Sequence, residues 1–232
     1  MSNYRDFIRR EIPDCFEELI RAVVPFVGAE TQRCKEDSIP IGDSKFCGKP
    51  DLPPNYQWPQ SSDGPCHFVG QLNFAQLSSF ETLHRLPAVG LLTFFYHDAE
   101  GHPEGAGSVV HYFSDPQLLV RTPVVLDMRF GEQFHSRHLF ARALTFAQRY
   151  VIEEDEFTDD DRVARFVDRF NNRFSRATHR LFGLPRYWTE PNCEHITLGS
   201  FGEWEDRINF SVPLSDLNAL DFSGLEVDYY CT

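Results

Sequence analysis

The stretch that decides the fold runs from residue 42 to residue 96. It reads GDSKFCGKPDLPPNYQWP (42–59), CHFVGQLNFAQL (66–77) and LPAVGLLTFFY (86–96). Five prolines between residues 47 and 65 exclude a long regular element there, because proline lacks an N–H and fixes φ. The remainder reads as a strand (66–73), a short helix (74–83) and a strand (90–96) that is apolar enough to be buried on both faces.

The Pro-rich loop, residues 47–65, has no ladder of backbone hydrogen bonds of its own, so side chains must hold it in place. Tyr56 and Trp58 are the expected anchors, since each buries a large ring and keeps a polar group. Gln71 lies in the following strand, and a buried amide needs partners for two donors and an acceptor. It either bonds the backbone of the loop or lines a pocket behind the loop together with Trp58 and Trp204.

The flanks of this stretch supply an N-terminal helix and further strands. Residues 3–24 carry apolar positions near a helical period. Pro13 interrupts them, so the stretch reads as one helix or as two, with Pro13 opening the second. Pro25 ends this helical stretch, and the segment that follows is polar without a clear period. A further strand is expected at 108–113, and a strand pair broken near Pro123 at 118–129. Residues 144–152 read as a strand or a helix, and the strand is preferred because Tyr150, Val151 and Ile152 favour it.

The clearest helix covers residues 159–180. Its apolar positions recur at spacings of three, four and seven, which places them on one face. Acids at its start suit the helix dipole, and Gly183 and Pro185 follow its end. The apolar positions are Val163, Phe166, Val167, Phe170, Phe174 and Leu181.

The C-terminal part follows the plan of the opening stretch. PLSDLNALDFS (213–223) resembles LNFAQLSSF (72–80), although the match is short and chance similarity is the alternative. The predicted fold is therefore α+β, a mostly antiparallel sheet in two related units near 66–152 and 194–232. An N-terminal helix and one long amphipathic helix (159–180) accompany the sheet. A chain of 232 residues can bury one core, so residues 1–232 are expected to form a single domain.

Composition narrows the classes of function. The chain has 22 Lys and Arg against 35 Asp and Glu, a formal net charge of −13. Nucleic-acid binding is not expected, because affinity for phosphate comes largely from cationic side chains. The excess of acidic over basic residues suits a cytoplasmic protein or one with a basic partner. No apolar run approaches the roughly 20 residues of a membrane span and no secretory signal is seen, so no membrane association is expected. The six cysteines form no CxxC pair and are expected to be reduced thiols.

Three blocks carry a family resemblance. They are SKFCGKPDLPPNYQWP (44–59) with FVGQLN (68–73), then LPAVGLLTFFY (86–96), and finally HRLFGLP (179–185) with DRINFSVPLSDLNALDF (206–222). These blocks resemble the YwqG-like family, a widespread and mainly bacterial group of domains of unknown function. The resemblance covers most of residues 40–225 and implies a fold without an established chemistry.

The chain departs from the family pattern in two places. Cys47 stands where the family often has a second glycine. The family commonly has a later counterpart to Gln71, whereas ITLGS (196–200) has no glutamine. A ligand-binding role of paired glutamines therefore does not carry over to this chain.

Other candidate sites carry weaker patterns. The hairpin from His97 to His111 gathers imidazole and carboxylate groups that can bind zinc or iron, but it lacks HxxxH and HExxH spacing. It reads as an exposed polar tip, with a metal site as the open alternative, and no metal or other cofactor is predicted. His135 and His138 offer a general base without a recognisable nucleophile, and no GxSxG, P-loop or GxGxxG is present. No catalytic residue is predicted.

The charge pattern around the long helix is unusual. An acidic run without a base precedes it, and arginines then follow at spacings of three or four, in a stripe about 100° from the apolar face. The arginine stems either cover the edge of the apolar face or form, with the acids, a surface that recognises a charged protein. The predicted partner-binding residues are Glu153, Glu154, Asp155, Glu156, Asp159, Asp160, Arg165, Arg169 and Arg173.

These features indicate a non-enzymatic cytoplasmic protein-binding protein. Its sharper form is an immunity (antitoxin-type) protein that neutralises a partner toxin by occlusion, and the acidic balance favours a basic toxin. The alternative is a small-molecule-binding protein or enzyme with a pocket behind the Pro-rich loop at 47–65. A structural or oligomer-forming module is a third reading.

Overall fold

The computed structural model describes residues 3–61, 64–80, 86–97, 107–125, 140–152, 160–183, 195–203 and 206–231. Its α-helices are α1 (Tyr4–Glu11), α2 (Phe16–Ala22), α3 (Phe74–Leu77), α5 (Asp161–Phe174) and α6 (Leu214–Ala219). Short 3-10 turns are η1 (Pro13–Cys15), η2 (Glu36–Ser38) and η4 (Pro116–Leu118). The longer strands are β1 (Val23–Arg33), β6 (His67–Asn73), β7 (Leu91–Tyr96), β8 (Val109–Phe113), β10 (Arg142–Ile152), β12 (His195–Glu203), β13 (Asp206–Pro213) and β14 (Glu226–Cys231). The shorter ones are β2 (Lys45–Phe46), β3 (Asp51–Leu52), β4 (Gln60–Ser61), β5 (Gly64–Pro65), β9 (Val120–Arg121) and β11 (His179–Leu181).

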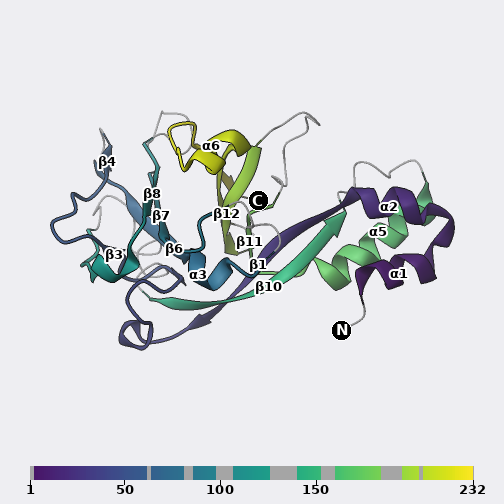
Figure 1. Cartoon of the computed structure of the whole chain (residues 1–232), viewed down its shortest axis with the longest axis horizontal. Helices are drawn as coiled ribbons and strands as arrows, with labels where there is room; N and C mark the ends of the chain where they lie inside the picture. The colour runs from purple at the N-terminus through teal and green to yellow at the C-terminus, as the bar shows by residue number, and fades with distance from the viewer. Residues whose placement is uncertain are drawn as a thin grey trace.

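Ten strands form one large sheet in the order β14-β13-β12-β11-β1-β10-β2-β6-β7-β8. Every pairing in this sheet is antiparallel. Two small sheets, β3-β9 and β4-β5, lie in and beside the Pro-rich loop. The α+β class with a mostly antiparallel sheet is therefore confirmed (Figure 1).

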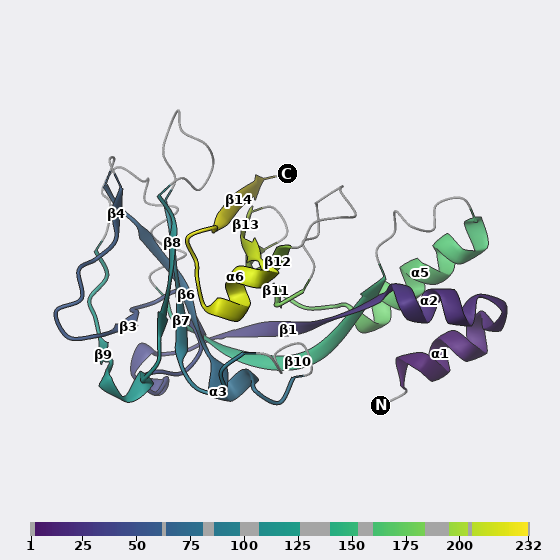
Figure 2. The same cartoon turned by 45° about the horizontal axis from the view of Figure 1, so that its top comes forward.

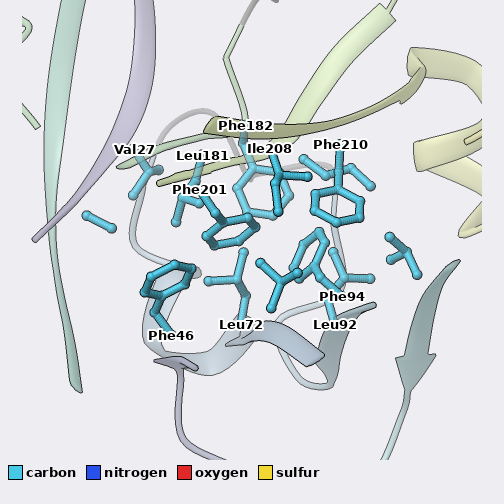
Figure 3. Packing of buried hydrophobic residues seen from close by; sticks show 14 of the residues in the cluster. Val27, Phe46, Leu72, Leu92, Phe94, Leu181, Phe182, Phe201, Ile208 and Phe210 are labelled. Carbon is cyan, nitrogen blue, oxygen red and sulfur yellow. The ribbon is translucent and has the colours of Figure 1, made fainter. Parts of the chain in front are cut away.

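The sheet curls until residues near its two edges meet. Strand β7 is second from one edge and β13 is second from the other, yet the rings of Phe94 and Phe210 are 5.1 Å apart. The ring of Phe201 on β12 lies 5.0 Å from that of Phe94 and 5.8 Å from that of Phe46. Figure 3 shows these side chains pointing toward one another from both halves of the sheet. The main core is therefore shared by both halves, which explains the heavy use of phenylalanine.

The longest strands, β1 and β10, make a ribbon at the middle of the sheet. They pair over eleven residues, from Val23 opposite Ile152 to Arg33 opposite Arg142. Figure 2 shows this ribbon running out from the rest of the sheet to the helices α1, α2 and α5. The sequence predicts β10 but not β1, because Pro25 and the polar residues after it conceal the strand. Among the described residues, β1 pairs on both sides only at Val27–Ala29. Pro25 lies before this part, where β1 has a neighbour on one side only, so its missing N–H is tolerated.

The three helices at the end of the ribbon form a separate lobe with its own apolar cluster. We call α1, α2 and α5 the helical lobe. Phe7, Ile8 and Ile12 pack there against Phe166 and other residues of α5, and Ile152 at the end of β10 completes the cluster. The N-terminal stretch is two helices, as one reading of Pro13 predicts, because Pro13 opens the 3-10 turn η1 between them. In the described ranges no helix is long and apolar enough to cross a membrane.

The helix predicted over 159–180 is wrong at its C-terminal end. Helix α5 ends at Phe174, with Ser175 as its C-cap, and residues 179–181 form strand β11. Leu181 fits the helical spacing and also the alternation of a strand in which His179 and Leu181 are buried. Pairing of β11 with β1 and β12 decides in favour of the strand. At the other end, Asp160 caps α5 by accepting hydrogen bonds from the N–H groups of Arg162 and Val163.

The two segments with similar sequences adopt similar local structure. LNFAQL leads from β6 directly into α3, and PLSDLN leads from β13 directly into α6. Their places in the sheet differ, because α3 joins the third and second strands from one edge, whereas α6 joins the second and first strands from the other.

Candidate functional site

The recognisable opening stretch builds an ionic cluster around the carboxylate of Asp51. This carboxylate is fully buried and accepts hydrogen bonds from Lys45 Nζ (3.2 Å), Arg121 Nε (2.6 Å) and Gln71 Nε2 (2.8 Å). The backbone N–H of Gly42 is a fourth donor at 2.9 Å. A buried carboxylate is stable only when its oxygens are paired in this way. We call Asp51, Lys45, Gln71, Arg121 and Glu36 the ionic clasp.

Gln71 uses both ends of its amide to hold the loop. Its Oε1 accepts from the N–H of Asp51 at 2.9 Å, and its Nε2 donates to the carbonyl of Asp43 at 2.7 Å as well as to the Asp51 carboxylate. The expectation that Gln71 bonds the backbone of the loop is confirmed. Its amide is therefore occupied by the loop in this structure.

Arg121 and Glu36 close the clasp from two other segments. Arg121 donates to the carbonyls of Glu36 (2.8 Å) and Ile39 (2.9 Å), and its guanidinium lies 3.1 Å from the Glu36 carboxylate. The same Glu36 oxygen pairs with Lys45 Nζ at 3.1 Å. Residues 36–51 are thus tied to β6 on one side and to β9 on the other.

Charge and burial act against each other in the clasp. Burial alone would raise the pKa of Asp51, but the hydrogen bond from Arg121 and the charge of Lys45 outweigh it and hold that pKa below its ordinary value. Burial lowers the pKa of Lys45, and the neighbouring carboxylates offset this only in part. Neither side chain has any exposed surface, so the geometry fits a structural role.

Tyr56 and Trp58 anchor the Pro-rich loop over a second small apolar cluster, as the sequence predicts. Trp58 Nε1 donates to the carbonyl of Cys66 at 2.8 Å, and its ring lies edge-on to Phe95 at 5.3 Å. The ring of Tyr56 lies 5.7 Å from that of Phe113. Trp58 thus packs on the Phe95 side of the loop, and Trp204 lies outside the described residues.

The predicted hairpin site is described only at its ends. His97 is buried and its Nε2 lies 2.5 Å from Ser61 Oγ, while burial lowers the pKa of His111. Residues 98–106 lie outside the described ranges, as do His135, Arg137 and His138. Within those ranges no three His, Cys, Asp or Glu side chains gather as a metal site.

The arginine stripe of α5 lies at the border with α1. Arg162 pairs with Asp14 at 2.5 Å, and Arg169 lies 4.0 Å from the carboxylate of Glu11. The hydrogen bond from Arg162 lowers the pKa of Asp14. Part of the stripe therefore covers the edge of the apolar face and pairs with α1 and η1, as the first of the two interpretations expects.

The rest of the predicted partner-binding set divides between described and undescribed residues. Arg165, Arg169 and Arg173 are exposed on α5, and Asp160 is its N-cap. The acidic run Glu153, Glu154, Asp155, Glu156 and Asp159 lies outside the described residues.

The fold and these two sites define an α+β protein whose curled antiparallel sheet carries a clasped Pro-rich loop at one end and a charged helical lobe at the other. The model of the family described as Domain of unknown function (DUF1963) matches residues 44–231. The chain therefore belongs to the DUF1963 family. No curated protein matches the sequence. Helices α1 and α2 precede the matched region, whereas the clasp residues apart from Glu36 lie within it.

Sequence reasoning missed most of the ionic clasp. Lys45 and Asp51 stand in the recognised block, and a lysine and an aspartate between Phe, Cys and Pro are a signal for a buried pair. Arg121 is 70 positions from Asp51 and ends the two-residue strand β9, so no local pattern indicates it.

Proposed function

We propose that this chain is a non-enzymatic, cytoplasmic protein-binding protein that contacts its partner through the helical lobe. One observation carries the proposal: the lobe is an apolar cluster separate from the sheet core, set at the end of the β1–β10 ribbon, with its arginines gathered in one stripe. A peripheral lobe with segregated charge presents a recognition surface without disturbing the main core.

The contrast with the clasp supports this assignment. The most recognisable motif of the chain holds a loop in place. Its residues Lys45, Asp51 and Gln71 are fully buried and so are not available to a partner protein. Exposed charge is found on the lobe instead, at Arg165, Arg169 and Arg173.

The sharper form of the proposal is an immunity (antitoxin-type) protein that occludes a partner toxin. The net charge of −13 supports a partner with a basic face, which would lie against the acidic run 153–159. The role needs no catalytic group, only an interface of about the standard size for a stable complex.

The test is capture of a partner from the native host with tagged wild-type protein. We expect one protein to be recovered in a stoichiometric amount, and a variant with Glu153→Lys and Glu156→Lys to recover much less of it. A matched variant with Asp37→Lys and Asp221→Lys changes the charge equally on exposed positions outside the helical lobe and should capture normally. Recovery of no stoichiometric protein would count against the proposal.

A second candidate, an enzyme or small-molecule binder at the Pro-rich loop, is supported by one contact. Ser61 Oγ lies 2.5 Å from His97 Nε2 at the end of that loop, the arrangement of a nucleophile and its base. A fluorophosphonate probe tests it: labelling that is lost in Ser61→Ala and in His97→Gln would support an enzyme. Absence of labelling in the wild type would remove this contact from consideration.

We also propose that the chain is a YwqG-like member of its family and that it holds two related sheet units, near 66–152 and 194–232. The sequences KFCG (45–48) and RLFG (180–183) support the second point, because each precedes one of these units and pairs with its first long strand, β6 or β12. Each places a non-glycine residue at positive φ, Cys47 at 59° and Phe182 at 52°. In the sheet, Lys45 pairs with Gln71 and Arg180 pairs with Ser200. Ser200 is thus the counterpart of Gln71.

A further inference from the structure

Exposed aliphatic side chains gather at the end of the sheet that carries the Pro-rich loop. Leu118, Ile41 and Val120 keep 66%, 54% and 44% of their surface exposed. Leu118 ends η4 and Val120 begins β9, with the buried Leu119 between them. Soluble proteins seldom cluster exposed aliphatic side chains unless that surface binds something. We call Ile41, Leu118 and Val120 the apolar patch.

The two segments that form the apolar patch are fixed to each other. Arg121 Nη2 donates to the carbonyl oxygen of Ile39 at 2.9 Å, two residues before Ile41. Gly42 packs against Pro116, the first residue of η4, so closely that a Cβ atom added at Gly42 would lie 3.1 Å from the Cβ atom of Pro116. A backbone fixed in advance lowers the entropy that binding removes.

Charged side chains of both signs stand on the segments around the apolar patch. Lys35 and Asp37 flank Glu36 of the ionic clasp, and the N–H of Lys49 donates to the Glu36 carboxylate at 2.9 Å. Asp115 is the N-cap of η4. The two lysines and the two aspartates are exposed. We call these four residues the charged rim. An apolar centre within a polar rim is the usual composition of a protein–protein interface.

We infer that the apolar patch joins two copies of this chain in a dimer. In a dimer with two-fold symmetry both copies contribute the same surface, and a residue of one copy faces a different residue of the other. A rim with two lysines and two aspartates can pair with itself in this way, whereas a rim of one sign would repel its copy. This matters because the net charge of −13 opposes self-association over the rest of the surface.

Dimerisation through the apolar patch would leave the helical lobes of both copies accessible. Strands β3 and β9 lie at one end of the molecule, and α1, α2 and α5 lie at the other (Figure 2). The inference therefore goes beyond the proposed function and does not depend on it. A change in the apolar patch should alter the mass in solution without altering the affinity of the helical lobe for a partner.

The first test is sedimentation velocity of the full chain over a range of concentrations. We expect a monomer–dimer equilibrium with a dissociation constant on the order of 10 µM, because three aliphatic side chains make a small apolar centre. Leu118→Ser should raise this constant at least tenfold. Leu214→Ser changes an exposed leucine of α6 in the same way and should alter it less than twofold. Circular dichroism confirms that each variant is folded.

A pair of charge variants tests the pairing of the rim with itself. Lys35→Glu with Lys49→Glu makes the charged rim acidic, and Asp37→Lys with Asp115→Lys makes it basic. Each variant alone should stay monomeric at concentrations where the wild type is half dimeric, and an equimolar mixture of the two should form a mixed dimer.

Three results would overturn the inference. They are a wild type that is monomeric at every concentration, an equal effect of Leu118→Ser and Leu214→Ser, and a mixture of the two charge variants that stays monomeric. None of these results bears on capture of a partner by the helical lobe, so the inference and the proposed function can fail separately.

Discussion

At the scale of single residues, His179 shows how the core constrains a titratable group. It is fully buried, with its ring 4.7 Å from that of Phe46 and 5.8 Å from that of Phe201. Burial, and then the charges of Arg207 and Arg142, lower the pKa of His179 to about 3. The imidazole is therefore neutral in the folded protein at every pH at which the fold is expected to be stable.

This histidine should make stability depend on pH. Between about 3 and 6.5 the unfolded chain binds a proton at His179 that the folded chain does not, so stability falls as pH is lowered through this window. From pH 7.5 to pH 5 the His179 contribution should cost about 2 kcal/mol. Urea denaturation of wild type and of His179→Asn at both pH values measures it. Between pH 7.5 and pH 5 the free energy of unfolding should fall by about 2 kcal/mol less in the variant than in the wild type. An equal fall in the two proteins would contradict the assignment.

At the scale of elements, the ionic clasp explains how the segment that leads into the Pro-rich loop is ordered. Residues 36–52 contribute only short strands and one 3-10 turn, so their polar groups depend on Arg121, Gln71 and Asp51. Removing one partner from a buried ionic cluster leaves the others unpaired, which is more harmful than losing an exposed pair.

Replacement of Arg121 should therefore loosen the whole loop. Arg121→Met is expected to lower the free energy of unfolding by about 3 kcal/mol and to speed hydrogen exchange at residues 42–52. Arg21→Met removes an arginine from an exposed position and should change stability by less than about 0.5 kcal/mol. Denaturant titration and exchange measured by mass spectrometry check both values. If Arg121→Met behaved like the control, the clasp would not hold the loop.

Elements with a strong local period could be predicted, and those defined by distant partners could not. The strands β6 and β7 and most of α5 follow from apolar spacing, and β10 follows from the strand preference of Tyr150, Val151 and Ile152. Strand β1 has no such pattern, because its pairing with β10 supplies the stability that its sequence lacks. The predicted C-terminal end of α5 is wrong for a related reason: at Leu181, pairing with β1 outweighs the helical spacing of the apolar residues.

At the scale of the whole molecule, one antiparallel sheet supports two surfaces of different kinds. The curled part encloses the phenylalanine core and carries the clasped loop at one end, and the β1–β10 ribbon carries the helical lobe away from them (Figure 2). The sequence indicates the charge pattern of the lobe but not its location, since the contacts of Arg162 with Asp14 and of Arg169 with Glu11 join helices about 150 residues apart.

The central claim is that the helical lobe, and not the sheet, binds the partner. Its most direct test is the affinity of the captured partner, measured by calorimetry, for a variant with Glu153→Lys, Glu154→Lys, Arg169→Glu and Arg173→Glu, which leaves net charge unchanged. We expect affinity to fall at least tenfold, about 1.4 kcal/mol. A control with Leu118→Ser and Val120→Ser, exposed residues of the sheet end, should bind as the wild type does. Undiminished affinity of the lobe variant, or loss of affinity in the control, would contradict the account.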